Sequence, residues 1–277
     1  MPQEESEFLQ VLAPHCQELT SNLIYGDVYY NLAVGQMWFQ FEYHEQAVTL
    51  WKPSLKVMKQ SLGKEHILTL KHRQKLAMSL YQMPGKIKEA LSLLRPLLAT
   101  FTRTVGPEHK DTLITTHFLA LIMKDLGQAN EALELQENLV QVSKNVYGKN
   151  HPKTLIEIEE LASILESLGK ESEALPLEQE LVQVTEKDLG KDHPHTLRRI
   201  QNMAITLRNL GRVEKALELQ QKTLSLSKEV MGELHPITLA MTQDLAETLR
   251  NLSKANEALA LEEEVLEISK NFWGEEH

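Results

Sequence analysis

The stretch Gly-Lys-Asn-His-Pro-Lys-Thr-Leu at residues 148–155 returns as Gly-Lys-Asp-His-Pro-His-Thr-Leu at residues 190–197. Its first glycine recurs along the chain at spacings of 43, 42, 42, 42 and 42 residues, and each time a histidine follows three positions later. The glycines are Gly63, Gly106, Gly148, Gly190, Gly232 and Gly274, and the histidines are His66, His109, His151, His193, His235 and His277. A fixed period of this length indicates a repeat array.

Each period predicts two helices. In one unit, Leu155, Ile158, Leu161 and Leu165 follow the helical i, i+3, i+4 spacing of a first helix, and a second apolar stripe begins at Ala174. Between the two stripes stands a glycine, as expected where a helix ends in a left-handed residue. These turn glycines are Gly85, Gly127, Gly169 and Gly211, and Ser253 takes the place in the last full unit. We therefore expect an all-α solenoid of antiparallel helix pairs.

The start of each first helix has its own signal. Pro152, Pro194 and Pro236 follow their histidines directly, and proline suits the first helical position because its missing N–H would be unpaired there. We expect each histidine to accept from exposed backbone N–H groups at the helix entrance or to pack on the preceding helix. His193 and His195 are expected to point to different sides.

The period divides the whole chain. It predicts an N-terminal helix or cap at 1–26, a degenerate unit at 27–61, five full units at 62–104, 105–147, 148–189, 190–231 and 232–273, and the start of a further unit at 274–277. In the degenerate unit Gly35 occupies the small position, Trp51 lies on the second helix and Glu42 replaces the turn glycine. Because the last residues repeat the opening of a unit, we expect the array to continue in a longer protein.

Composition narrows the classes of partner. The 277 residues hold 39 acidic and 29 basic side chains, for a formal net charge of −10, with no basic stripe and no long apolar run. We expect no nucleic-acid partner and no membrane partner, since both anionic surfaces would repel such a chain on average. Cys16 is the single cysteine, which excludes an internal disulfide and favours a reducing, cytoplasmic location.

The histidines and carboxylates predict no catalytic, cofactor or metal site. Equivalent histidines of stacked units would lie about 10 Å apart, whereas zinc ligands lie about 2 Å from the metal. His44-Glu45 begins like a zinc protease motif, but Val48 stands where the second histidine is needed. The Gly-Lys steps lack the rest of a P-loop. The acidic residues of 152–188 are expected to be solvated or to pair with Arg198, Arg199, Arg208 and Arg212 of the next unit.

The order of a small residue, a large apolar residue, a turn glycine and an alanine, here Ala162, Leu165, Gly169 and Ala174, resembles the tetratricopeptide repeat (TPR). The 42-residue period and the two Gly-Lys-Asx-His-Pro stretches are similar to the kinesin light chain type of that family. The resemblance covers residues 62–277. It implies a right-handed superhelical solenoid whose concave face, lined by the first helices, binds a protein or peptide segment.

The resemblance also implies which side chains line that face: the positions three before, one after and four after the small residue. These are Leu32, Gln36 and Phe39 in the degenerate unit, then His117, Leu121 and Lys124, Glu159, Ser163 and Glu166, Gln201, Ile205 and Arg208, and Gln243, Glu247 and Arg250. The unit 62–104 has an extra residue, so Gln74 and Met78 rank below the others.

Two alternatives to a non-catalytic binding scaffold stay open. Residues 12–19, Leu-Ala-Pro-His-Cys-Gln-Glu-Leu, resemble the Leu-Leu-Pro-His segment that precedes such repeats in STAND-type, NLR-like ATPases. This resemblance implies a sensor region of a larger protein with an upstream nucleotide-binding domain. The other alternative is an enzyme that uses the groove as its active site.

Overall fold

The computed structural model describes residues 25–273, and within them every element is an α-helix. The twelve described helices are α2 (Tyr25–Gln40), α3 (His44–Ser61), α4 (Ile67–Tyr81), α5 (Ile87–Thr104), α6 (Lys110–Asp125), α7 (Ala129–Tyr147), α8 (Pro152–Ser167), α9 (Glu171–Leu189), α10 (Pro194–Asn209), α11 (Val213–Met231), α12 (Pro236–Asn251) and α13 (Ala255–Trp273). The N-terminal helix or cap predicted for 1–26 lies almost wholly outside these residues, and the partial unit at 274–277 lies entirely outside them. The segment at 12–19 and Cys16 also lie outside the described residues.

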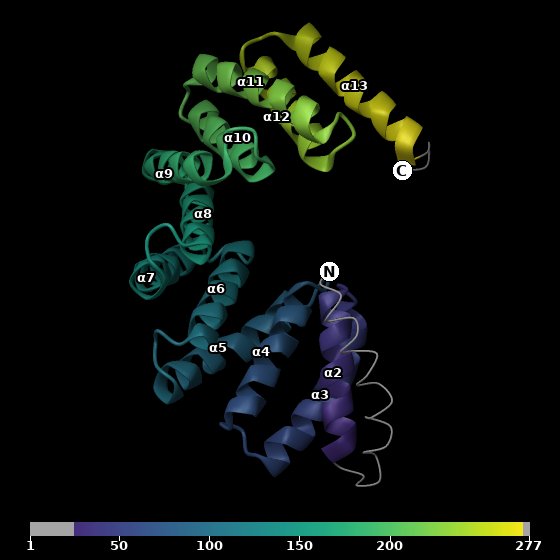
Figure 1. Ribbon diagram of the computed structural model, residues 1–277, viewed down its shortest axis with the longest axis vertical. Coiled ribbons are helices and arrows are strands. Elements are labelled where there is room, and N and C mark those ends of the chain that lie inside the picture. Colours follow the sequence, from purple (N-terminus) through teal and green to yellow (C-terminus); the bar gives the residue numbers. More distant parts are fainter. Residues whose placement is uncertain (1–24, 274–277) are drawn as a thin grey trace. The chain divides into compact units, whose positions relative to one another are not determined.

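The helices form two compact units, Met1–Leu135 and Gln136–His277, with the boundary inside α7. In unit 1 each helix from α2 to α6 packs against the next, and α4 also contacts α6. In unit 2 the same holds from α8 to α13, with a further contact between α10 and α12. Figure 1 shows this succession of helical hairpins within each unit. The expected all-α architecture of paired helices is confirmed, whereas the exact division into repeat units stays a prediction.

The repeated histidine begins the first helix of each pair. In α4, α6, α8, α10 and α12 the residue before the helix is His66, His109, His151, His193 or His235, with an extended backbone. The Nδ1 atom accepts a hydrogen bond from the backbone N–H two residues later, over 3.2 Å at His151. Because the first N–H groups of a helix have no partner within the helix, this bond satisfies one of them. The expected capping role is confirmed.

The threonine of the repeat also forms a hydrogen bond with the glycine that opens the unit. Thr154 Oγ1 donates to the carbonyl oxygen of Gly148 over 2.8 Å, and Thr112 makes the same bond to Gly106 over 2.7 Å. The side chain thus closes the turn that leads into the first helix. One expectation for this turn is wrong: the rings of His193 and His195 stack, with centroids 5.4 Å apart and planes 17° apart. Pro194 at the helix start brings them together instead of directing them apart.

The short turn within each pair requires a left-handed residue. The turn glycines have φ between 69° and 75°, and Ser253 and Glu42, which replace them, have φ of 59° and 64°. A side chain in this region costs energy that glycine avoids. The degenerate pair therefore keeps the repeat geometry even though Glu42 replaces the glycine. Gly35 keeps the small position because an added Cβ would collide with the Trp51 ring.

The core lies between the helices of each pair and between successive pairs. The alanines expected at close helix approaches are buried, among them Ala162 at 3% exposed and Ala174 at 0%. In unit 2 one such cluster joins α10, α11, α12 and α13 through Leu197, Leu224, Met241, Leu245, Ala246, Leu249 and Ala258. Because each pair buries its apolar stripe only against its neighbours, the repeat needs no distant segment to complete a core.

Candidate functional site

A concave site lies between α12 and α13 in unit 2. It is a pocket of about 480 Å³, which falls within the range of small-ligand sites. Gln243, Asp244, Glu247 and Arg250 line it from α12, and Glu262 and Val265 line it from α13. Three of these six, Gln243, Glu247 and Arg250, are the side chains that the repeat register predicts for this unit.

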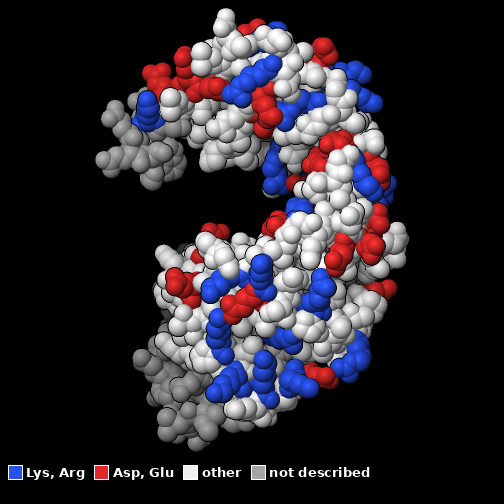
Figure 2. All heavy atoms as spheres, turned by 180° about the vertical axis from the view of Figure 1, so that it is seen from behind, with Lys and Arg blue, Asp and Glu red and all other residues white. Residues whose placement is uncertain are grey.

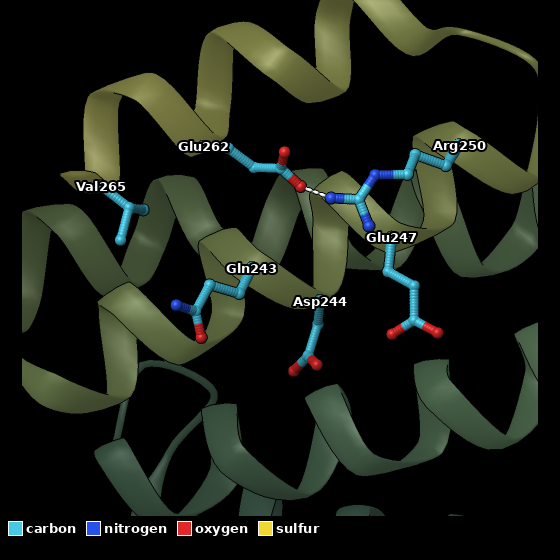
Figure 3. Close-up of a pocket in the computed structure, with 6 residues that line it drawn as sticks. All are labelled: Gln243, Asp244, Glu247, Arg250, Glu262 and Val265. Carbon is cyan, nitrogen blue, oxygen red and sulfur yellow. Dashed lines mark ion pairs between the residues drawn. The ribbon is translucent and has the colours of Figure 1, made fainter.

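Ion pairs hold the walls of this pocket. Arg250 pairs with Glu262 across the pocket, while Gln243, Asp244 and Glu247 point from α12 to the same side (Figure 3). The Arg250 side chain is 53% exposed, so a ligand has access to it. Val265 adds an apolar surface to an otherwise polar wall. The pocket therefore offers both signs of charge, an amide and one apolar contact to an incoming chain.

Below α12, the preceding first helix supports the pocket. Arg208 Nη1 of α10 lies 2.9 Å from Glu247 Oε2, and Gln201 Nε2 donates to Asp244 Oδ2 over 2.8 Å. Burial raises the pKa of Asp244, and the Glu247 carboxylate adds to this effect. The Gln201 hydrogen bond and the Arg208 charge oppose it. Arg208 and Gln201, both predicted as groove residues, thus position the carboxylates of the next repeat.

Similar contacts join α8 to α10, the first helices of the two preceding pairs. Glu159 of α8 accepts from Arg198 over 2.9 Å and pairs with Arg199 over 3.3 Å, and Glu166 accepts from Thr206 over 2.5 Å. The predicted pairing with the acidic residues of 152–188 is confirmed for Arg198 and Arg199, whereas Arg208 pairs with Glu247 of the following unit. Ser163 and Ile205 lie half-buried on the same helices. Most predicted side chains of α8 and α10 therefore link repeats to one another within the fold.

In unit 1 the predicted residues lie on three first helices. Phe39 of α2 packs against His44 and Trp51, with ring centroids 5.5 Å and 5.9 Å away, and Gln36 accepts from Lys75. Leu32, His117, Leu121 and Lys124 are half-buried. Gln74 is 5% exposed and donates to Asp111 O and Thr115 Oγ1, both over 2.7 Å, which places it inside the helix packing.

A second pocket, of about 560 Å³, lies in unit 1. Phe39 and Met78 line it together with residues that the repeat register did not select, namely Gln40, Glu42, His44, Gln82 and Phe118. Asp244, Glu262 and Val265 were missed in the same way in unit 2. These residues lie beside the selected positions, in the turn or on the second helix. Glu262 and Val265 follow the buried Ala258 by four and seven residues, which is the only sequence signal for them.

Charge is distributed differently over the two units. On the face shown in Figure 2, lysine and arginine side chains gather over unit 1, whereas acidic and basic side chains are interspersed over unit 2. Exposed basic side chains of α3 and α5 include Lys52, Lys56, Lys59, Lys88, Arg95 and Arg103. The sequence shows no basic run because these residues are spaced along two helices. On this face the two units thus present different charge distributions.

No helix between residues 25 and 273 is both long and apolar enough to span a bilayer. Over the same residues, no three histidine, cysteine, aspartate or glutamate side chains gather as a metal site would require.

Comparison with known proteins identifies the family. Residues 111–187 and 196–271 match the family model described as tetratricopeptide repeat, and residues 43–147 match a second TPR model. A crystal structure of nearly identical TPR-like repeats, assigned to a kinesin light chain from Podosopora anserina, is 30% identical. The match covers 73% of this chain and 95% of that chain, with a TM-score of 0.64. The chain belongs to the tetratricopeptide repeat family, and its repeats are of the kinesin light chain type.

Two more distant structures share the fold. BtubC (BKLC) from P. vanneervenii is 16% identical over 83% of this chain and 92% of that chain, with a TM-score of 0.66. A Rap protein complexed with competence and sporulation factor is 14% identical over 96% of this chain and 80% of that chain, with a TM-score of 0.60. No curated protein matches the chain.

Proposed function

We propose that this chain is a non-catalytic scaffold that binds a peptide or protein segment on the face formed by the first helices of its pairs. The observation that carries the proposal is the α12–α13 pocket, where Gln243, Glu247 and Arg250 converge as the repeat register predicts. The Rap protein, which shares this fold, is in complex with competence and sporulation factor. Tetratricopeptide solenoids expose extended surfaces suited to such recognition.

The chemistry of the pocket supports recognition of an extended chain. A guanidinium, an amide and three carboxylates supply donors and acceptors for peptide groups, and Val265 supplies an apolar contact. Their geometry is held by the Arg250–Glu262 and Arg208–Glu247 pairs. Because these side chains are held in place before a ligand arrives, ordering them on binding costs less free energy.

A titration of the chain with a synthetic peptide library tests the proposal. We expect Arg250→Ala and Gln243→Ala to weaken binding of the selected peptides about 5- to 30-fold, which corresponds to about 1–2 kcal/mol. Lys215→Ala, which removes an exposed positive charge on α11 outside the pocket, is the matched control and should leave affinity unchanged. Unchanged affinity in both pocket variants would reject this face as the binding surface.

The sensor alternative, a regulatory region of a STAND-type ATPase, stays a hypothesis. It rests on residues 12–19, which lie outside the described residues, and it requires an upstream nucleotide-binding domain. The sequence of the intact gene product distinguishes it from an independent scaffold. Cytoplasmic location is likewise proposed from the single Cys16 and is tested by imaging the tagged full-length protein.

A further inference from the structure

The pocket of unit 1 differs in chemistry from the pocket between α12 and α13. Three of its seven lining side chains are large and apolar: Phe39 lies at the end of α2, Met78 near the end of α4 and Phe118 in the middle of α6. Polar groups stand beside them, namely the amides of Gln40 and Gln82, the Glu42 carboxylate and the His44 ring. Neither lysine nor arginine lines this pocket among the described residues.

Both phenylalanine rings are held by their neighbours. Phe39 contacts the rings of His44 and Trp51, and Phe118 lies edge-on to Tyr81 at 6.1 Å and to His117 at 5.3 Å. Edge-on and tilted contacts of this kind stabilise aromatic pairs. The two rings therefore keep their positions without a ligand, so a bound apolar group meets preformed walls.

Met78 makes the pocket adaptable in size. It is half-buried and lies between these elements on α4. Methionine is unbranched and polarisable, so it fills irregular gaps and contacts aromatic rings favourably. A pocket with fixed aromatic walls and one flexible side chain suits a large apolar side chain of variable shape.

The charge at this pocket is negative and unpaired. Glu42 is exposed in the turn between α2 and α3, and it makes no ion pair with any residue from 25 to 273. Its φ of 64° is sterically costly for a residue with a side chain, and glycine stands at the equivalent place in four other turns. A carboxylate beside two phenylalanine rings and a methionine is complementary to a positive charge next to an apolar group.

We infer that the pocket formed by α2, α4 and α6 binds a large apolar side chain of a peptide segment whose adjacent residue is lysine or arginine. This inference rests on the proposed peptide-binding function and adds the class of ligand sequence that unit 1 selects. The apolar side chain lies against Phe39, Met78 and Phe118, and the cationic side chain pairs with Glu42. The amides of Gln40 and Gln82 hydrogen-bond the peptide backbone.

An array of short peptides tests this directly. Two neighbouring positions are varied over all residues in a glycine and serine background, and the full chain is the probe. The expected result is selection of leucine, methionine or phenylalanine beside lysine or arginine. Binding of peptides without this preference would overturn the inference while leaving the proposed function intact. A chain that binds no peptide on the array or in the library titration would overturn both.

The variant Glu42→Asn isolates the charge. Asparagine tolerates the left-handed backbone better than most residues, so the turn is kept while the carboxylate is removed. We expect affinity for the lysine- and arginine-flanked peptides to fall about two- to five-fold, as for the loss of an exposed ion pair. Two variants serve as controls: Ser253→Asn at the equivalent turn of the last pair, and Glu45→Gln, which removes a carboxylate outside the pocket. Equal losses in Glu45→Gln would contradict the assignment.

Two further variants address the apolar part. Phe118→Ala should lower affinity roughly tenfold, because the peptide side chain loses one wall. If Phe118→Ala fails to fold, Met78→Ala keeps the inference testable, since a wider pocket should shift selection toward tryptophan. Retained selection for the same residues in Met78→Ala, with thermal unfolding unchanged, would place the apolar side chain elsewhere.

Discussion

Glu178 of α9 occupies a repeat position that carries a neutral side chain in the neighbouring pairs. Gln136 and Gln220 stand 42 residues before and after it, and all three are buried. Burial raises the pKa of Glu178 to about 8, and the charge and hydrogen bond of Glu166 add to the effect, while the hydrogen bond of Thr206 opposes it. The carboxyl group is therefore protonated in the folded protein near neutral pH and is ionised in the unfolded chain.

This difference predicts a pH-dependent stability. Because the folded state holds the proton more tightly, the contribution of Glu178 is full below about pH 4.5 and is lost as pH rises through about 8. Glu178→Gln should remove this loss and be more stable than the parent at the alkaline end, by a few kcal/mol at most. Urea unfolding of both proteins at several pH values between 5 and 9 measures this difference in the free energy of unfolding. Glu186→Gln, exposed on the same helix, is the control, and parallel pH profiles for parent and Glu178→Gln would contradict the prediction.

At the scale of the helices, α10 and α12 carry equivalent predicted groove residues that differ in burial. The Arg208 side chain is 8% exposed and links α10 to Glu247 and to the carbonyl oxygen of Asp244 on α12. Arg250 stands at the same register position in the next pair, 42 residues later, but it is 53% exposed and pairs with Glu262 at the pocket. Burial separates the side chain that joins two helices from the one that is accessible to a ligand.

Alanine variants of the two arginines should therefore differ. Arg208→Ala is expected to lower the free energy of unfolding by about 1–3 kcal/mol, because buried hydrogen bonds of a charged group are lost. Arg250→Ala is expected to change stability by about 0–1 kcal/mol, as for exposed pairs, while weakening peptide binding. Chemical denaturation of both variants checks the contrast. Equal destabilisation would show that exposure does not separate their roles.

At the scale of the molecule, each helix from α2 to α6 in unit 1 and from α8 to α13 in unit 2 contacts its neighbours in sequence, and in two cases the helix after next. A core defect should therefore stay local, because a repeat array has no contacts that carry it further. Leu245, 5% exposed in the cluster of α10 to α13, provides the test.

Leu245→Ala should cost about 2–5 kcal/mol, and amide hydrogen exchange should speed up in α11, α12 and α13. Exchange in α3, α4 and α5 of unit 1 should stay at the parent rate. Leu97→Ala, buried in unit 1, is the reciprocal control and should show the opposite pattern. A uniform increase along the chain in either variant would indicate a single cooperative unit instead of a repeat array.

The sequence by itself determined the helix pairs, because their signals are local. His151 caps its own helix, Pro152 suits the next position, Thr154 bonds back to Gly148, and Gly169 takes the left-handed turn, all within one unit. The period also identified Glu42 as the residue that stands in place of the turn glycine. Such interactions join residues a few positions apart, so the residues that make them recur with the period and can be recognised in the sequence.

Only the tertiary structure decided which predicted groove residues stay accessible. Gln201 and Arg208 bind the carboxylates of the next repeat through a hydrogen bond and an ion pair. Gln243, Glu247 and Arg250 instead line a pocket. Phe118 and Glu42 meet at another pocket although 76 positions separate them. Exposure and pairing depend on the side chains of neighbouring helices, which vary from unit to unit, so the register identifies candidate positions and the packing assigns their roles.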